Sequence, residues 1–498
     1  MGRLPPKGTL CAGLTASPCP CFAGTSRHIS DALTLKMVFD MNKAVSEKES
    51  FFTKDKTFYS ALFKMLIIVA LQNLVAYSVN VVDNIMLGGY SQTALSGVTI
   101  VNQIFFMVQQ ITIGIGNALV ILASQYWGQK RTEPIRILTG IAMKWGTVFS
   151  IVVIAVCVIF PRQLLSLFTS DSEILAEGVG YMYIVVWSFV LFILTNTLMS
   201  ALRSVETVKI SFYISVVSLF INIFGNAIFI YGLLGFPEMG AKGAALSTVI
   251  ARAIEFLIIL FYIIKIDKKL NLFSGKITEK NPQLRKDYKK VTMPLLLNQI
   301  LWGLSVPIQT AILGHLSSDA IAANSVASTF YQYLKVVVKA MASTSNVLIG
   351  NAIGRGDIKR VKSDARSMAV IDVILGIILA LALFCLRKPL LSFYSLSETA
   401  KSLAINFIAI YSLLMVGMSF QMPVCDGIIS GGGNPEFVLK VNMISFWAIC
   451  LPLSLAAAFW WNLPVELVVL CVQADQLFKC IPYFLRLRSY KWIRKLTN

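Results

Sequence analysis

The sequence predicts an all-α polytopic membrane protein with twelve transmembrane helices in two six-helix lobes, related by a pseudo-two-fold axis along the membrane normal. Three observations lead to this prediction. The chain of 498 residues is 56% hydrophobic and only 14% charged, whereas soluble proteins carry about 25% charged residues. Apolar runs of about 20 residues, long enough to cross a bilayer, recur along the chain. The two halves of the chain repeat the same order of runs and loops.

The apolar runs are continuous rather than alternating, which argues against a transmembrane β-barrel. Two of the predicted spans, 94–125 and 320–352, exceed the ~20 residues that a bilayer requires, so we expect them to tilt or to project from it. The twelve spans are predicted at 61–87, 94–125, 137–160, 178–202, 208–233, 242–265, 293–316, 320–352, 367–386, 402–429, 437–460 and 464–485.

The internal repeat appears when the chain is shifted by 226 residues. LQNLVAYSVNVVDNIMLGGYSQTAL (71–95) then aligns with LNQILWGLSVPIQTAILGHLSSDAI (297–321), and Gly128 with its basic loop aligns with Gly354 and its basic loop. Each half has an even number of spans, which makes the repeat parallel. The predicted regions are an N-lobe of helices 1–6 at 56–265, a cytoplasmic linker at 266–291, a C-lobe of helices 7–12 at 292–487 and a basic cytoplasmic tail at 488–498.

Residues 1–55 are interpreted as a disordered extension. Its first ~36 residues have no apolar core of the kind found in secretory signals. An alternative is that they are translated from an upstream start and that Met37 or Met41 is the native beginning.

The net charge of +19 does not indicate nucleic-acid binding, because its distribution follows the rule that Lys and Arg favour cytoplasmic loops. Basic residues gather after even-numbered spans, in the loops near 130, 205, 275 and 360. We therefore expect a multi-pass protein of the cell (inner or plasma) membrane with both termini in the cytoplasm. The basic tail and linker are either solvated or in contact with anionic lipid.

Two lobes around a central cleft are typical of a transporter rather than an enzyme. The sequence has no Walker A loop, and its two histidines, His28 and His315, form no metal cluster. We therefore expect no catalytic residues, no cofactor and no metal site, apart from a possible Na⁺ near Asp83. Asp83 is an acid within the first span, where a charge is costly, and it is a functional hypothesis for that reason.

Several motifs resemble the multidrug and toxic compound extrusion (MATE) family. They are VDNIMLGGYSQTAL, YWGQKR with its twin IGRGDIKR, FINIFGNAIFIYGLLGFPEMGAKGAALST (220–248) and DGIISGGGNPE. The resemblance covers about 60 to 490. It implies an antiporter that exports organic cations, drugs or metabolites in exchange for H⁺ or Na⁺. The expected partners are a cationic, amphipathic small molecule and membrane lipid, and we expect a monomer.

The resemblance also implies a coupling-cation site in the N-lobe. Its acid matches Asp83, and its companions match Asn222 and Asn226, four apart on one helix face, and Thr248. Na⁺ would suit an oxygen cage of these four residues, whereas a proton would need only Asp83. We favour H⁺.

The sequence departs from the family in three places. Many relatives have a proline in the first helix, but Phe63–Leu87 has none. Asn226 is neutral where some relatives have Asp. The positions of C-lobe acids in two other branches fall on Trp302 and Ser419, so a C-lobe cation site of either type is not expected.

Other polar residues inside the spans are candidates for the cleft or for substrate binding. Lys335 and Lys339 are too deep to face lipid, so they face the cleft or pair with an acid such as Asp372 or Asp426. Two further pairs, Asp475–Lys479 and Arg252–Glu255, have the spacing of self-contained helix ion pairs. The candidates are Gln72, Asn73, Lys335, Lys339, Asp372 and Asp426.

Two other transporter classes have the same architecture. A flippase for lipid-linked saccharides stays open because Lys335 and Lys339 would make the cavity more cationic. A carrier of the major facilitator type is disfavoured because its signature in the loop after the second span is absent from YWGQKRTEPIR.

Overall fold

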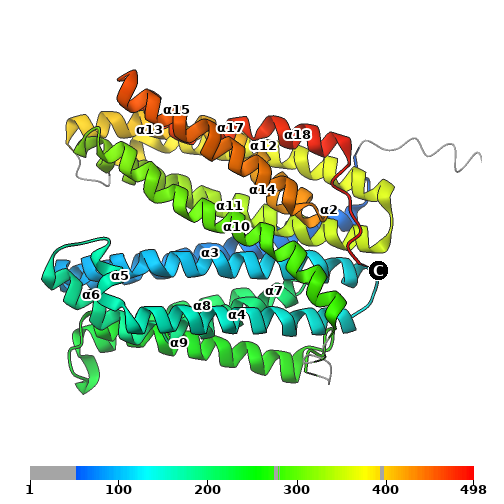
Figure 1. Cartoon of the computed structure of the whole chain (residues 1–498), viewed down its shortest axis with the longest axis horizontal. Helices are drawn as coiled ribbons and strands as arrows, with labels where there is room; N and C mark the ends of the chain where they lie inside the picture. The colour runs from blue at the N-terminus through cyan, green and yellow to red at the C-terminus, as the bar shows by residue number, and fades with distance from the viewer. Residues whose placement is uncertain (1–51, 274–278, 280, 393–396, 498) are drawn as a thin grey trace, which may run out of the picture. The chain divides into compact units, whose positions relative to one another are not determined.

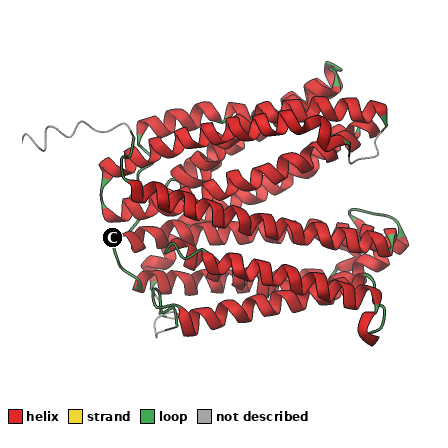
Figure 2. Cartoon of the chain, turned by 180° about the vertical axis from the view of Figure 1, so that it is seen from behind, coloured by secondary structure: helices red, strands yellow, loops and turns green. Residues whose placement is uncertain are grey.

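The computed structural model describes residues 52–273, 279, 281–392 and 397–497. The predicted extension 1–55 lies outside them except for its end at 52–55. Within the described residues every regular element is a helix and there is no strand (Figure 2). The elements fall into two halves that follow one another along the chain (Figure 1).

The first half, the N-lobe, contains the elements before the linker. Its helices are α2 (Lys56–Tyr90), α3 (Gln92–Gly128), α4 (Glu133–Ile159), α5 (Pro161–Ser166), α6 (Ser172–Val185), α7 (Ser188–Ser204), α8 (Lys209–Tyr231), η1 (Leu233–Gly235), α9 (Ala241–Phe261) and η2 (Tyr262–Ile266).

The second half, the C-lobe, begins earlier than the sequence predicts, because α10 starts within the expected linker. Asn281 accepts a hydrogen bond from the backbone N–H of Leu284 and caps this helix, and Pro282 occupies its first position. The C-lobe helices are α10 (Pro282–Gly314), α11 (Ser318–Arg355), α12 (Ile358–Leu391), α13 (Glu398–Met422), η3 (Pro423–Ile429), α14 (Pro435–Met443), η4 (Ile444–Cys450), α15 (Leu451–Leu455), η5 (Ala456–Trp460), α16 (Val465–Gln473), α17 (Asp475–Phe478) and α18 (Cys480–Ser489).

Ten helical segments of the described chain are long and apolar enough to cross a membrane. The bent pair α6–α7, which turns by 51° between its halves, makes an eleventh span. The remaining predicted span, 242–265, is the sixth along the chain and corresponds to α9, which is not among these eleven. Helix α9 has 21 residues and carries the predicted pair of Arg252 and Glu255, whose side chains form an ion pair of 2.8 Å.

The helix starts confirm the internal repeat. Lys56 and Pro282 begin the first long helix of each half, and they are 226 residues apart. Helices α3 and α11 begin at the same offset, as do α8 and α14. At these three places the helix starts of the two halves therefore match to the residue, as the predicted parallel repeat requires.

The two lobes share a buried core at one end. In the first shared cluster, Phe58 and Leu62 of α2 are grouped with Met341 of α11. In the second, Leu119 of α3 is grouped with Tyr288 of α10. The Tyr288 hydroxyl also donates a hydrogen bond of 2.9 Å to the carbonyl oxygen of Ile115. These residues lie toward the end of the lobes that carries the basic loops.

At the opposite end each lobe has a core of its own. Leu87 and Ile230 belong to a cluster made up of N-lobe residues, and Leu313 and Ala323 belong to one made up of C-lobe residues. The lobes are therefore joined at the basic end and packed separately at the other end.

Glycines allow α3 and α11 to touch at the shared end. A Cβ added at Gly128 would lie 2.2 Å from the carbonyl oxygen of Asn351, and one at Gly354 would lie 2.0 Å from that of Gln125. Gly128 and Gly354 are equivalent positions of the repeat, so the pseudo-two-fold axis passes close to this contact. Any larger residue at Gly128 or Gly354 would force the backbones of the two helices apart.

The predicted basic tail packs against both lobes. Trp492 is fully buried, and its indole N–H donates to the carbonyl oxygen of Leu487. The backbone N–H of Arg494 donates to Gly432 of the C-lobe, and that of Leu496 donates to the Gln125 side chain of the N-lobe. The tail therefore ties the lobes together at their joined end.

A second tie lies at the start of α2. The Asp55 carboxylate accepts hydrogen bonds from Thr57 and forms an ion pair of 2.7 Å with Arg360 of α12. The hydrogen bonds from Thr57 hold the pKa of Asp55 below its usual range. Asp55 thus caps the first helix and links it to the C-lobe.

Candidate functional site

The candidate coupling site lies between α2 and α8. Asp83 is half-buried on α2, and Asn222 and Asn226 are buried on one face of α8. The Asn226 amide nitrogen donates to Oδ1 of Asp83 at 2.5 Å and lies 3.3 Å from Oδ1 of Asn222. Three of the four residues that the sequence predicts for this site are therefore in contact.

Close packing of α8 against α9 brings the fourth residue near. A Cβ at Gly225 would lie 2.4 Å from the Ser247 hydroxyl oxygen, so only glycine allows this approach. The Ser247 hydroxyl donates to the carbonyl oxygen of Asn222. Thr248 follows on α9, where its own hydroxyl donates to the carbonyl oxygen of Ala244. Within the described residues no hydrogen bond joins Thr248 to Asp83.

The site has an unused acceptor. Oδ1 of Asn226 is buried and has no hydrogen-bond donor among the described residues. Buried amide oxygens are normally satisfied. Together with the carboxylate of Asp83, this oxygen gives the site the capacity to accept a proton or another small cation.

The C-lobe contains a second group of charges, on α11, η3 and α17–α18. Lys479 and Asp475 form the predicted pair, with Nζ and Oδ2 2.6 Å apart and both side chains buried. Gln476 donates to the other carboxylate oxygen of Asp475 and accepts from Gln421. This pair is therefore satisfied by its own neighbours.

Lys335 and Lys339 differ from that pair. Both are half-buried in the membrane-spanning helix α11. Within the described part of the chain, no carboxylate lies within ion-pair distance of either ammonium group. The ammonium of Lys335 instead lies 4.9 Å from the ring centre of Trp302 on α10, in the geometry of a cation–π interaction.

Among the described residues, neither Asp372 nor Asp426, the acids proposed as partners of these lysines, forms an ion pair with a lysine. Asp426 is half-buried, and its Oδ1 accepts a weak hydrogen bond of 3.3 Å from the thiol of Cys425. Asp372 is fully buried on α12, and neither of its carboxylate oxygens has a hydrogen-bond partner among the described residues.

The two polar candidates of the first span lie in the middle of α2. Gln72 is half-buried, with its amide nitrogen 3.9 Å from the sulfur of Met199 on α7. Asn73 is also half-buried. Within the described residues there is no group of three or more His, Cys, Asp or Glu side chains that would hold a metal ion.

A comparison with protein families decides what this architecture is. The MatE family model matches the chain twice, over residues 69–228 and 294–455, which together make up more than half of it. The chain belongs to the MATE family. The two matched segments fall in the two lobes, in agreement with the repeat. Membership of this family makes the protein a membrane transporter.

Known MATE proteins are similar over most of their length. The multidrug resistance protein NorM of Vibrio vulnificus is 24% identical over 400 residues, which are 79% of this chain and 86% of NorM. The probable multidrug resistance protein YoeA of Bacillus subtilis is 22% identical over 378 residues, 75% of this chain and 81% of YoeA. The crystal structure of the Vibrio cholerae MATE transporter VcmN in the bent form has a TM-score of 0.78 at 19% identity, covering 87% of this chain and 97% of VcmN.

The structure places two further residues near the candidate coupling site that the sequence analysis did not name. Arg252 lies within electrostatic range of Asp83, while it pairs with Glu255 and lies 4.9 Å from the Phe192 ring centre. Tyr181 is buried on α6 and lies within electrostatic range of Asp83. The i,i+3 spacing of Arg252 and Glu255 predicted their ion pair. Nothing in that spacing indicated that Arg252 would lie near Asp83 of α2.

Proposed function

We propose that this MATE protein is a secondary active antiporter that exports organic cations, drugs or metabolites in exchange for a coupling cation, H⁺ or Na⁺. One observation carries the proposal. Asp83, an ionisable side chain well inside a membrane span, contacts Asn226 across the interface of α2 and α8. An intramembrane acid held by neutral amides, rather than by a direct salt bridge, is suited to gaining and losing a small cation.

Alternating access would use the single joined end of the lobes. If the basic loops face the cytoplasm, the shared core, the glycine contact and the tail all lie on the cytoplasmic side. The structure would then represent an outward-facing state. Loading of Asp83 would accompany opening of these contacts and closure at the opposite end.

H⁺ suits the N-lobe site better than Na⁺. The N–H side of the Asn226 amide faces Asp83 and Asn222, whereas a Na⁺ ion requires oxygen atoms directed at it. Arg252 lies within electrostatic range of Asp83, and its positive charge disfavours the binding of H⁺ and of Na⁺ alike, so it does not distinguish the two ions. A proton can bind a carboxylate oxygen of Asp83 without any turn of the Asn226 amide.

The proposed substrate is a cationic, amphipathic small molecule, and the proposed setting is the plasma membrane, with the protein as a monomer and both termini in the cytoplasm. The names of the relatives NorM and YoeA, both multidrug resistance proteins, support export of such compounds.

A flippase for lipid-linked saccharides is the second candidate. The observation in its favour is that Lys335 and Lys339 are half-buried with no carboxylate at ion-pair distance among the described residues. A cationic cleft would suit the phosphate groups of such a substrate.

Uptake of ethidium into inverted membrane vesicles tests the antiporter proposal. An imposed inward-acidic pH gradient should drive accumulation, and a Na⁺ gradient alone should not. Accumulation driven only by Na⁺ would reverse the choice of ion. No response to either gradient would contradict the proposal, and translocation of a lipid-linked saccharide by the same vesicles would establish the flippase.

The C-lobe lysines yield a prediction that separates a cleft residue from a structural one. Lys335→Gln should express and fold normally, because it leaves no ion-paired acid behind. It should lower the KM for ethidium efflux, because it removes a positive charge that repels the substrate. Complete loss of ethidium transport by a well-folded Lys335→Gln variant would contradict the placement of this lysine as a repelling charge in the cleft.

Lys479→Gln is the matched variant for comparison. It should destabilise the protein by roughly 3–5 kcal/mol, because it leaves the buried carboxylate of Asp475 unpaired. Thermal unfolding in detergent measures the loss, and the double variant Lys479→Gln/Asp475→Asn should restore most of it. Equal unfolding temperatures for Lys479→Gln and Lys335→Gln would show that both lysines have the same role.

A further inference from the structure

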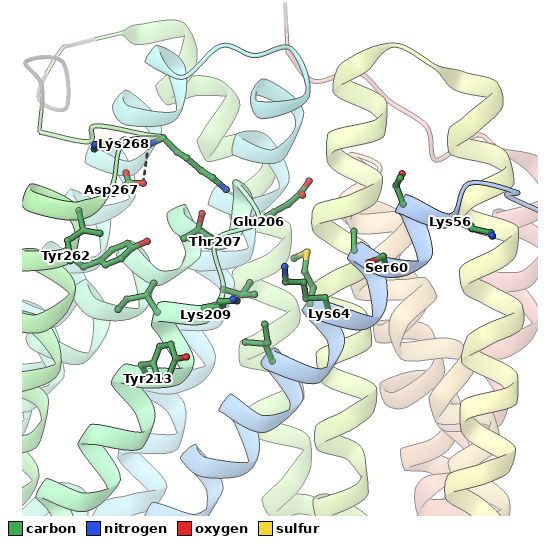
Figure 3. A pocket seen from close by; sticks show the side chains of 18 residues that line it. Lys56, Ser60, Lys64, Glu206, Thr207, Lys209, Tyr213, Tyr262, Asp267 and Lys268 are labelled. Atoms are coloured by element: carbon green, nitrogen blue, oxygen red, sulfur yellow. Dashed lines mark hydrogen bonds between the residues drawn. The ribbon is translucent and has the colours of Figure 1, made fainter.

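A basic pocket lies at the end of the N-lobe that carries the basic loops, away from Asp83. It has a volume of about 840 Å³ and opens between the start of α2, the α7–α8 connection and the end of η2 (Figure 3). Lysines and aromatic or apolar side chains share its lining. The lysines are Lys56, Lys64, Lys209, Lys268 and Lys269.

The pocket carries excess positive charge because its five lysines outnumber its two acids, Glu206 and Asp267. Glu206 accepts a hydrogen bond from Asn351, and Asp267 accepts hydrogen bonds from the backbone N–H groups of Lys269 and Leu270. Within the described residues, no carboxylate lies at ion-pair distance from Lys64 or Lys209.

Lys64 and Lys209 form the centre of the charge. In Figure 3 they reach into the pocket from facing helices, whereas Lys56 and Lys268 point away from its middle. Ser60, on the same face of α2 as Lys64, and Thr207 also line the pocket. Two ammonium groups in a pocket that also contains hydroxyl groups supply donors of the kind that a phosphate diester requires.

The lining changes from charged to apolar along each helix. On α2, Lys64 is followed one turn later by Ile68. On α8, Lys209 is followed by Tyr213, and the same helix face continues as an open apolar groove that includes Val217. Along this face of α8 the basic pocket is therefore followed by a separate apolar groove.

The apolar groove along α8 has the length of an acyl chain. It is lined by Val217, Phe220 and Phe224, and the two phenylalanines are 53% and 65% exposed. Phe220 lies roughly 16 Å along the helix from Lys209, close to the ~15 Å hydrocarbon thickness of one leaflet. The buried face of α8, opposite the groove, carries Asn222 and Asn226.

We propose that this pocket binds an anionic phospholipid, with the phosphate between Lys64 and Lys209 and one acyl chain along the α8 groove. Charge complementarity selects the anionic headgroup. The apolar groove that follows the pocket along the same face of α8 selects a lipid over a free phosphate ester. The bound lipid would contact the helix whose other face holds the coupling-site asparagines.

Native mass spectrometry of the full chain in mild detergent tests the proposal with phosphatidylglycerol, phosphatidylcholine and glycerol 3-phosphate as probes. Phosphatidylglycerol should bind at one site and more tightly than phosphatidylcholine. Lys64→Gln/Lys209→Gln should weaken phosphatidylglycerol binding roughly 30-fold, about fivefold for each lysine near an anionic group. Lys286→Gln/Lys290→Gln removes the same charge from exposed positions outside the pocket and should leave binding unchanged.

A groove variant separates the lipid from a free phosphate. Val217→Trp fills the start of the α8 groove and leaves both lysines in place, so it should weaken phosphatidylglycerol binding. Equal binding of phosphatidylglycerol and phosphatidylcholine would overturn the proposal. Phosphatidylglycerol binding that is unchanged in Lys64→Gln/Lys209→Gln would also overturn it. Binding of glycerol 3-phosphate as tight as that of the lipid, unaffected by Val217→Trp, would show a phosphate-ester site instead of a lipid site.

Discussion

Asp83→Asn is expected to abolish gradient-driven efflux while expression stays near normal. Asparagine has nearly the shape of the protonated acid, so the packing of α2 against α8 and the contact with Asn226 are kept. It cannot gain or lose a proton, so loading of the site no longer depends on the gradient. Ethidium efflux from cells and uptake into inverted vesicles both measure the loss.

Two further variants control this result. Asp171→Asn makes the same chemical change at an exposed helix cap, where asparagine caps equally well, and should transport normally. Asn226→Ala should weaken coupling less than Asp83→Asn if the ion is H⁺, and about as severely if it is Na⁺. Undiminished efflux by Asp83→Asn would leave this residue with a structural role alone.

Gly354→Ala is expected to reduce efflux about tenfold without unfolding the protein. Its new Cβ would lie 2.0 Å from the backbone oxygen of Gln125, so α3 and α11 must separate at the joined end. Overpacking of this kind destabilises a protein by about 1–3 kcal/mol. Here it would destabilise the conformation in which the two lobes are in contact at this end. Hydrogen exchange should rise in the tail segment 490–497, which bridges the same end.

Gly314→Ala is the matched control. Gly314 also lies in a long C-lobe helix, but its added Cβ would meet only the Ile321 side chain at an ordinary 3.6 Å. Alanine is the better helix former, so this variant should be as stable as the wild type and fully active. Equal efflux by the two alanine variants would show that contact of α3 and α11 at Gly354 is not required for transport.

The repeat and the helix register were accessible from sequence. Bilayer thickness fixes the length of each apolar run, and basic loops mark the ends, so the offset of 226 residues that aligned the motifs also aligned the helix starts. The contact of Asp83 with Asn226 followed from family resemblance, and the i,i+4 and i,i+3 ion pairs followed from helix geometry.

Contacts between distant segments were not accessible in the same way. The burial of Trp492 depends on the loop at Gly432, against which its ring packs. These two residues are 60 positions apart in the sequence. The approach of Arg252 to Asp83 depends on how α9 packs against α8 through Gly225. The lysines of the basic pocket come from three separate segments that only the folded N-lobe brings together. Composition and periodicity describe one helix at a time, so they do not predict which distant segments come into contact.

The central claim is that Asp83 carries the ion that is exchanged for substrate. It is tested most directly by adding ethidium to the purified protein in weakly buffered detergent solution and measuring the protons released. The account predicts release of about one proton per ethidium bound to the wild type, because substrate and proton favour opposite states of the N-lobe. Asp83→Asn should bind ethidium and release none. Ethidium binding to the wild type without proton release, or equal release by Asp83→Asn, would contradict the account.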